Sequence, residues 1–449
     1  MKRIDVLNLE WTCTASRDRT AASLVCNYLR LQGASVVEGS IFEGYHLINK
    51  YSPKVVFMTN TIGAVINHEV IKYAKRRNIF CVSLISEGNI FGDEKYVAQM
   101  IWGWNKDKIL YEDYQLQWTK RTYDLTIKQH PELAERIFVS GAVGFDLYKI
   151  QKYDSKNIFL QKYQKSKFSK VVGVAGWAFN LFYEDSNNFE VYEKIYSYKD
   201  IERFRKDHIE FNRILSDVMK KNPDTLFILK GHPGATDSNS TGFDGLINLS
   251  NSIYITDQED ISTCISVSDI WLVYDSTTML EAWLCGKKTA MINPNGSDFL
   301  RDDLYRGNPN LVNSDKIHDA LSSFFQGLPF HEFNKLLDIR NKLVEEVIQW
   351  DDGLNHVRAG NFILNKLESE DFKVLKEVIE DKKKRLSRKI KNLFLKILYK
   401  LTKKRKFKRS FDPSDVELYA KELFELQSSY YKKSSKSREN LLTLKVLPR

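Results

Sequence analysis

Apolar segments of strand length alternate with amphipathic segments along most of this 449-residue chain, and this alternation is the feature that most restricts its fold. Within residues 1–150 the predicted strands lie at 4–10, 34–40, 54–60, 79–86, 108–112 and 136–141. Continuous apolar strands joined by helices are typical of a parallel sheet that is covered by helices on both faces. We therefore expect an α/β domain in this part of the chain.

The same pattern begins again after a polar, lysine-rich segment at 151–170, which we interpret as a linker. Further strands are predicted at 171–177, 225–231, 252–256, 269–276 and 287–294, with helices around 201–221, after 276 and within 315–368. We expect a first domain at 1–165, a second at 166–370 and a tail at 371–449. The predicted fold is α/β, with two Rossmann-like parallel-sheet domains that face a cleft and bind ligands at the carboxyl ends of their strands.

The positive charge of the chain is concentrated in one segment. Residues 382–409 contain 15 Lys and Arg and no Asp or Glu, so the other 53 basic residues are outnumbered by 58 acidic ones. The apolar residues of this segment recur at helical spacing: Leu386, Ile390, Leu393, Phe394, Ile397, Leu398 and Leu401. We predict a basic amphipathic helix on an anionic membrane surface. A helix packed on the protein body is the alternative, and we expect no nucleic-acid partner because the rest of the chain is mildly acidic.

Several protein classes lose support from what the sequence lacks. No apolar run reaches the roughly 18–20 residues of a spanning helix, and the N-terminus meets polar residues too early for a secretory signal. The five cysteines are scattered without zinc spacing. The motifs of P-loop NTPases, Rossmann dehydrogenases, α/β-hydrolases and zincins are missing, as is a convincing Asp-x-Asp pair. We expect a cytoplasmic protein without a metal or cofactor.

Hydroxyl residues follow the predicted strand at 269–276 and open the next helix. Ser276, Thr277 and Thr278 combine side-chain donors with the free N–H groups and the dipole of a helix N-terminus, which is an arrangement that binds phosphate. Glu281, one turn further on, is suited to accept hydrogen bonds from ribose hydroxyls. The alternative is ordinary capping by Asp275 or Ser276, with Glu281 as the capping-box partner.

Two other predicted strand ends carry residues suited to catalysis. Lys230 and His232 lie at the end of the strand at 225–231, where they could bind a diphosphate or protonate a leaving oxygen. The alternative is a turn with a solvated histidine. Glu87 ends the strand at 79–86 and is a candidate general base for an acceptor hydroxyl, with a turn or capping acid as the alternative. We interpret Asp18 and Asp146 as helix N-caps.

Taken in order, these motifs resemble bacterial surface-polysaccharide glycosyltransferases of the GT-B architecture. The resemblance rests on Glu87-Gly88, Gly141 to Asp146, Gly176 to Asn180, His232-Pro233 and Ser276 to Ala282, and it covers about residues 1–365. It is to the group called surface carbohydrate biosynthesis proteins, which serve capsule and lipopolysaccharide synthesis. Polysialyltransferases, Kdo transferases and CDP-glycerol glycerophosphotransferases are more distantly similar.

The resemblance implies an inverting, metal-independent glycosyltransferase that uses a CMP- or UDP-linked sugar and a glycan or lipid-linked glycan acceptor. It implies Glu87 as the base, His232 at the donor phosphate, and a donor site made of Lys230, Ser276, Thr277, Thr278 and Glu281. Related sequences often have Arg where Lys230 stands, and Lys keeps the charge but not the bidentate fork. A CDP-glycerol-type glycerophosphotransferase and a nucleotide-sugar epimerase are the alternatives. The expected location is the inner face of the bacterial membrane, with peripheral attachment through 382–409.

Overall fold

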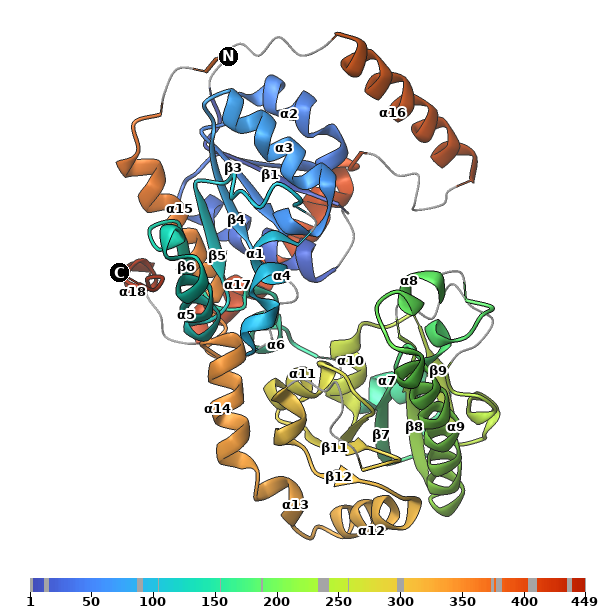
Figure 1. The fold of residues 1–449 in the computed structure, drawn as a ribbon. Coiled ribbons are helices and arrows are strands. Elements are labelled where there is room, and N and C mark those ends of the chain that lie inside the picture. The colour runs from blue at the N-terminus through green and yellow to red at the C-terminus, as the bar shows by residue number, and fades with distance from the viewer. Residues whose placement is uncertain are drawn as a thin grey trace. The chain divides into compact units, whose positions relative to one another are not determined.

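The chain folds into two compact units, which we describe separately (Figure 1). The computed structural model describes residues 3–11, 16–86, 92–103, 105–153, 155–186, 189–232, 242–256, 258–296, 303–372, 375–376, 382–402, 410–433 and 438–448. The first unit comprises Met1–Gln151 and Glu345–Arg449, and the second unit comprises Lys152–Val344. None of the helices described is both long enough and apolar enough to cross a membrane.

The first unit contains a six-stranded parallel sheet in the order β2-β1-β3-β4-β5-β6. Its strands are β1 (Val6–Glu10), β2 (Val36–Ser40), β3 (Val55–Thr59), β4 (Phe80–Leu84), β5 (Tyr114–Gln117) and β6 (Ile137–Val139). Every residue of β1 and β3 is buried, as expected for strands covered on both faces. The strand predicted at 108–112 is wrong, since β5 begins at Tyr114. Strand β5 has no continuous apolar run in the sequence, because Gln115 and Gln117 interrupt it although both are buried.

The helices of the first unit come from both ends of the chain. They are α1 (Arg17–Leu31), α2 (Gly44–Tyr51), α3 (Val65–Arg76), α4 (Val97–Trp102), α5 (Lys120–Gln129), α6 (Leu147–Ile150), α15 (Asn355–Ser369), α16 (Lys382–Thr402), α17 (Pro413–Lys433) and α18 (Arg438–Leu442). Helix α14 (Leu337–Ile348) contains the boundary between the units. Helices α1 and α15 pack closely, because a Cβ on Gly360 would lie 2.4 Å from the ring of Tyr28. The Tyr28 hydroxyl also donates to Asn361 at 2.6 Å.

The division of the structure differs from the boundaries expected at 165/166 and 370/371. Residues of α15, including Ala359 and Ile363, belong to the same buried cluster as Val25 of α1 and Val82 of β4. Helix α17 also packs on α1, and Leu423 is buried there. The physical reason is that α1 offers apolar residues that the returning C-terminal chain covers, together with Val143 and Ile150 of the N-terminal segment. Residues 371–449 are therefore not one separate tail.

The second unit contains another six-stranded parallel sheet, in the order β12-β11-β10-β7-β8-β9. Its strands are β7 (Lys170–Ala175), β8 (Thr225–Lys230), β9 (Ser252–Ile255), β10 (Ile270–Val273), β11 (Lys288–Ile292) and β12 (Asn310–Leu311). Its helices are α7 (Lys156–Lys162), α8 (Phe189–Glu193), α9 (Tyr198–Lys221), α10 (Ile261–Val267), α11 (Thr278–Leu284), α12 (Ser314–Phe325) and α13 (His331–Asn334).

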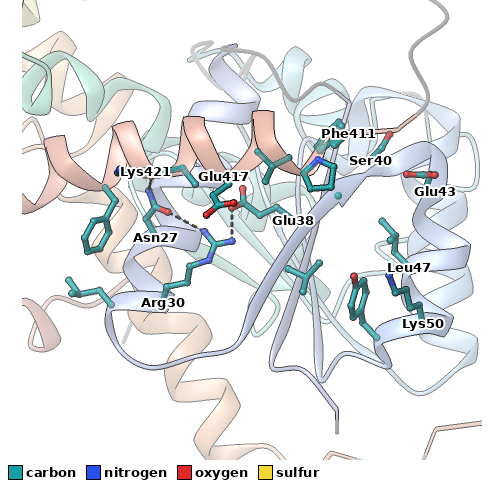
Figure 2. Close-up of a pocket in the computed structure, with 18 residues that line it drawn as sticks. Asn27, Arg30, Glu38, Ser40, Glu43, Leu47, Lys50, Phe411, Glu417 and Lys421 are labelled. Carbon is teal, nitrogen blue, oxygen red and sulfur yellow. Dashed lines mark hydrogen bonds and ion pairs between the residues drawn. The ribbon is translucent and has the colours of Figure 1, made fainter. Parts of the chain in front are cut away.

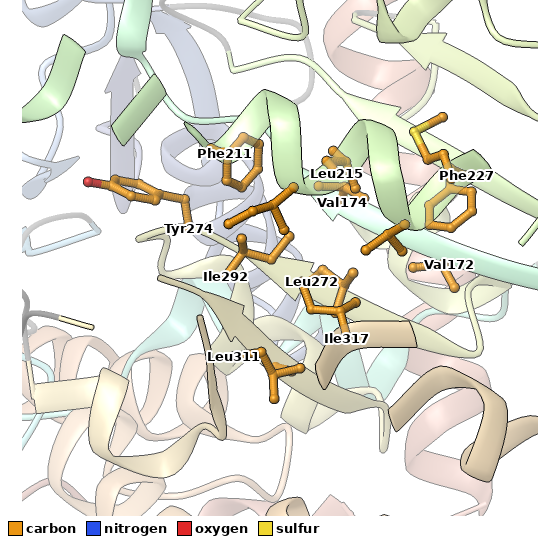
Figure 3. Packing of buried hydrophobic residues seen from close by; sticks show 14 of the residues in the cluster. Val172, Val174, Phe211, Leu215, Phe227, Leu272, Tyr274, Ile292, Leu311 and Ile317 are labelled. Atoms are coloured by element: carbon orange, nitrogen blue, oxygen red, sulfur yellow. The ribbon is translucent and has the colours of Figure 1, made fainter. Parts of the chain in front are cut away.

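The core of the second unit lies between this sheet and helices α9 and α12. Val172 and Leu272 of the sheet meet Leu215 of α9 and Ile317 of α12 in one buried cluster (Figure 3). The segment at 151–170 is not simply a linker, because it forms α7 and buries Phe159 and Leu160. Both sheets confirm the predicted α/β class with two Rossmann-like domains. The basic amphipathic helix predicted near the C-terminus is present as α16.

Candidate functional site

Each sheet has a point where the strand order reverses, and these two points define where a ligand site is expected. In the second unit the order reverses between β7 and β10, and in the first unit between β1 and β3. Loops diverge at the carboxyl ends of these strands, so polar side chains there are open to a ligand. In the second unit, the residues predicted for the donor follow β8 and β10, the strands on either side of β7.

Gly176, directly after β7, draws the end of β8 close to it. The Gly176 N–H donates to the Lys230 carbonyl at 2.8 Å. A Cβ on Gly176 would lie 2.6 Å from that oxygen and 3.1 Å from the His232 nitrogen, so a side chain does not fit there. His232 is thereby placed beside the end of β7.

His232 and Lys230 differ in their surroundings. Burial lowers the pKa of His232 below its ordinary value, so the imidazole is neutral at neutral pH and offers one N–H donor. A phosphate group next to it would favour the charged form again. The Lys230 ammonium instead donates to the backbone carbonyl of Thr256, which follows β9. Of the two, His232 is the better placed for a ligand between β7 and β10.

The turn after β10 holds the predicted hydroxyl residues. Helix α11 begins at Thr278, its cap position is Thr277, and no side chain caps it. The Thr278 hydroxyl donates to Ser276 Oγ at 3.1 Å and accepts from the Trp271 indole at 3.0 Å. Ser276 Oγ also accepts from the Thr278 N–H at 3.3 Å, which leaves the Ser276 proton to be donated. Because α11 has only seven residues, a phosphate at this turn would meet hydroxyls more than a strong helix dipole.

Glu281 lies inside the second unit. It is the fourth residue of α11 and only 2% exposed, so it is not a capping-box partner, whereas Ser276 does accept the first N–H of the helix. Burial and the neighbouring Cys285 raise the pKa of Tyr153, and the charge of Glu281 adds to this effect. A ribose contact from Glu281 would require the ligand to enter the turn between β10 and α11.

A buried carboxylate that the sequence analysis missed holds this strand edge together. Asp207 of α9 accepts hydrogen bonds from the hydroxyl of Tyr274, after β10, and from the amide of Asn295, after β11. Next to it, His208 contacts the Tyr183 hydroxyl at 2.9 Å, and burial lowers its pKa. Adjacent Asp and His on the apolar face of a predicted helix are the signal that marks these residues in the sequence.

In the first unit, Glu10 occupies the reversal point of the sheet. It ends β1 and is 2% exposed. Its carboxylate accepts from the Thr59 N–H at 3.0 Å and from the Thr59 hydroxyl at 2.5 Å, at the end of β3. Burial and, after it, the charge of Asp18 raise the pKa of Glu10 to about 8. Glu10 is therefore mostly protonated at neutral pH. An acid as the last residue of an apolar strand is the sequence signal for it.

Asp18 is the second acid at this point, and its interpretation as an N-cap is wrong. The N-cap of α1 is Ser16, whose hydroxyl accepts from the Arg19 N–H at 3.2 Å. The Asp18 carboxylate instead accepts from Ser86, after β4, and from Asn60, after β3, at 3.3 Å. Burial raises the pKa of Asp18. Two carboxyl groups whose charges interact thus lie at the strand ends of the first unit.

The sequence also singles out Glu87 and Asp146 in the first unit. Glu87 lies outside the described residues, which end here at Ser86, the partner of Asp18. Asp146 stands at the N-cap position of α6 without capping it. Its carboxylate accepts from the Asn355 amide at 2.9 Å and from the His356 N–H at 2.7 Å, so it fastens α15.

A cavity of about 880 Å³ lies beside β2, the edge strand of the first sheet, among α1, α2 and α17 (Figure 2). Arg30 lies on its wall, 2.7 Å from Glu38. Burial raises the pKa of Glu38, but Arg19 and Arg30 outweigh this and hold the pKa below its ordinary value. Glu10 and Asp18 are not among its lining residues. This cavity is therefore distinct from the strand-end site.

No protein-family model matches the chain, and no curated protein does. Among the described residues, no group of three or more His, Cys, Asp or Glu is placed to hold a metal ion. Solved structures do match. A protein of Listeria monocytogenes assigned as a UDP-N-acetylglucosamine 2-epimerase is 12% identical over 84% of this chain and 100% of its own, with a TM-score of 0.51. S. aureus MnaA, solved with UDP, is 11% identical over 81% of this chain and 97% of its own, with a TM-score of 0.51. At these identities the likeness shows the fold, which is GT-B, with two Rossmann-like domains.

Proposed function

We propose that this protein is a glycosyltransferase that moves a sugar from a CMP- or UDP-linked donor to a surface glycan. The observation that carries the proposal is the pair of polar strand ends on either side of β7 in the second unit, which the glycine after β7 lets come close. His232 follows β8, Gly176 follows β7 and Ser276 follows β10. Rossmann-like sheets bind nucleotides at this position. Of the two similar structures, one is assigned as an epimerase of a UDP-sugar and the other was solved with UDP.

In the proposed reaction the acceptor hydroxyl gives its proton to a carboxylate and attacks the anomeric carbon of the donor sugar with inversion. The bond from that carbon to the phosphate oxygen breaks, and the nucleotide leaves with the extra negative charge. Neutral His232 and the hydroxyls of Ser276 and Thr277 are the donors that would stabilise this charge. No metal is needed for these steps.

Glu87 is the proposed base. Asp18 is a second candidate, because its neighbour Ser86 directly precedes Glu87 and because burial raises its pKa. A carboxylate with a raised pKa takes a proton more readily than an ordinary one. Glu10, mostly protonated at neutral pH, is less suited to the role of base.

We propose a lipid-linked glycan of capsule or lipopolysaccharide synthesis as the acceptor, and the inner face of the bacterial membrane as the site of action. The resemblance of the motifs supports this acceptor class. A CDP-glycerol donor is the alternative for the same site, since its phosphates would meet the same hydroxyls and imidazole.

A nucleotide-sugar epimerase is the second candidate, and one observation favours it. Such an enzyme needs acid and base groups besides the nucleotide site, and Glu10 and Asp18 supply two interacting carboxyl groups at the strand ends of the first unit. In an epimerase, these two carboxyl groups would take a proton from a sugar carbon and give one back.

One experiment separates these functions. The purified protein is incubated with UDP- and CMP-sugars and with CDP-glycerol, with and without lipid extracts of a capsulated bacterium. Nucleotide release that depends on the extract is the expected result. An isomerised sugar nucleotide formed without extract would identify an epimerase, and release from CDP-glycerol alone among the donors would identify a glycerophosphotransferase. No change in any mixture would contradict all three.

A further inference from the structure

Helix α16 exposes large apolar side chains to an unusual degree. Ile390, Leu393, Phe394, Ile397 and Leu401 are 60%, 62%, 60%, 48% and 76% exposed. Ile390, Phe394, Ile397 and Leu401 follow one another at steps of four, three and four residues, and Leu393 lies three residues after Ile390, so the five form one face of the helix. Single exposed apolar residues are ordinary on a protein surface, but a continuous face of them marks an interaction surface.

The rest of α16 is basic. Its sequence from Lys382 to Thr402 contains nine Lys and Arg and no Asp or Glu. Lys391 and Lys400, within the exposed apolar stretch, are themselves exposed. The exposed apolar side chains run from Ile390 to Leu401, which is about 17 Å of the helix, and Lys391 and Lys400 lie in the same stretch.

Helix α17 is a useful comparison, because it packs on the first unit. It also has 21 residues, but it carries Asp415 and Glu417 and buries Leu423 against the first unit. Its Gln427 side chain donates to the Leu24 carbonyl of α1 at 2.9 Å. In α16 the apolar face has no such cover in the described structure. A hydrogen bond from Asn392 to the Phe42 carbonyl, at 3.2 Å, joins α16 to the first unit and leaves that face outward.

We propose that α16 lies in the headgroup region of an anionic phospholipid bilayer, with its apolar face among the acyl chains and its Lys and Arg at the phosphates. Charge complementarity selects this occupant, because nine cations without an acid suit an anionic surface. The apolar face is buried by the same position. Nucleic acid would use the cations but would leave five large apolar side chains in water. A protein groove would use the apolar face but would not need such a charge.

Vesicle flotation of the full-length protein tests the proposal. Phosphatidylcholine vesicles with and without phosphatidylglycerol are compared, at low and at high salt. We expect binding to the anionic vesicles only, and weaker binding at high salt because salt screens the cations. Equal binding to both vesicle types, or binding to neither, would overturn the proposal.

Three variants locate the surface. Replacing both Leu393 and Phe394 with Ser should weaken binding more than about tenfold, since two large apolar side chains lose their burial. Replacing both Lys391 and Lys400 with Gln should weaken it about thirtyfold. The matched control is Ile209→Ser on α9, where Ile209 is 69% exposed, and it should bind as the wild type does. If the Leu393 and Phe394 variant still floats fully, α16 is not a membrane helix. The same holds if the wild type binds duplex RNA and not vesicles, and the variant loses that RNA binding.

This inference is independent of the proposed reaction. Circular dichroism should show that the variants keep their fold, and UDP should stabilise them as it does the wild type. Loss of vesicle binding with unchanged nucleotide binding supports α16 as the membrane surface. A protein that floats but ignores every nucleotide would contradict the proposed function and leave the membrane surface established.

Discussion

At the scale of single residues, Glu10 is the group whose protonation is most closely tied to folding. Its pKa rises from 4.5 to about 8 because burial and the charge of Asp18 disfavour the carboxylate. The folded protein therefore holds a proton that the unfolded chain loses above pH 4.5. The stability from this group is complete below that pH and is lost as the pH rises through about 8.

We predict that Glu10→Gln removes much of this pH dependence. Glutamine has the shape of a protonated glutamate, and its oxygen can accept from Thr59 N–H while its amide donates to the Thr59 hydroxyl. Urea unfolding at pH 5 and pH 8 is the measurement. The wild type should lose at least about 1.4 kcal/mol more than the variant over this range, the energy of one pKa unit. Glu132→Gln, at an exposed site, is the control. Parallel curves for wild type and Glu10→Gln would show that Glu10 is ionised in the folded state.

The base of the proposed transfer is also a question for single residues. We predict that Glu87→Gln lowers turnover about 10²–10⁴-fold while the affinity for the donor stays nearly the same, because a base acts on the acceptor. Asp18→Asn is measured beside it, by turnover and by calorimetric donor binding. If only Asp18→Asn loses turnover, Asp18 is the base and Glu87 is not.

Residue roles are harder to predict from sequence than strand positions. Ser16 and Asp18 both precede or open α1 and both have side chains suited to capping, so the sequence leaves the choice open. The backbone makes Ser16 the cap and turns Asp18 toward Ser86, which lies 68 residues away. A contact over that distance depends on how β1, β3 and β4 lie together, and local pattern contains no information about it.

At the scale of elements, apolar strands were predicted well because they are buried on both faces. The predicted segments 4–10 and 225–231 contain β1 and β8. Strand β5 was missed because Gln115 and Gln117 alternate with its apolar residues although both are buried. The packing of α17 on α1 was missed for another reason, since an amphipathic helix shows that it has a partner but not which one.

We predict that Tyr431→Phe destabilises the first unit, because it breaks the contact that joins α17 to α15. The Tyr431 hydroxyl lies 2.5 Å from His356 Nε2, and the other ring nitrogen of His356 lies 2.8 Å from Asp146. All three residues are buried. Loss of the hydroxyl leaves a buried imidazole nitrogen without its partner, which costs about 1–3 kcal/mol.

The neighbouring residue gives a matched control for this prediction. Tyr430 donates to the Asp352 carbonyl at 2.7 Å but is only partly buried, so water can replace its hydroxyl. Tyr430→Phe should cost less than Tyr431→Phe in chemical unfolding of the full chain. Equal losses would show that α17 does not depend on the Asp146–His356–Tyr431 contacts.

At the scale of the whole molecule, the two units have separate sheets and separate cores, so ligand binding should stabilise one unit more than the other. Tyr431→Phe identifies the thermal transition of the first unit, because it lowers that transition. We predict that UDP or CMP raises the transition of the second unit instead. A ligand at a hundred times its Kd adds about 2.7 kcal/mol to the unit that binds it.

The residues after β8 and within α11 should carry this shift. In His232→Ala and Glu281→Ala the rise with nucleotide should be much smaller than in the wild type, whatever the stability of the unliganded variants. His318→Ala is the matched control, because His318 belongs to α12 of the same unit and not to a strand end. Differential scanning calorimetry with and without nucleotide gives the rise for each protein. If nucleotide raises the transition temperature of both His232→Ala and Glu281→Ala as much as that of the wild type, these residues do not bind the nucleotide and serve only the turn and the packing of the unit. A rise in the first transition would move the nucleotide site to the strand ends that hold Glu10 and Asp18.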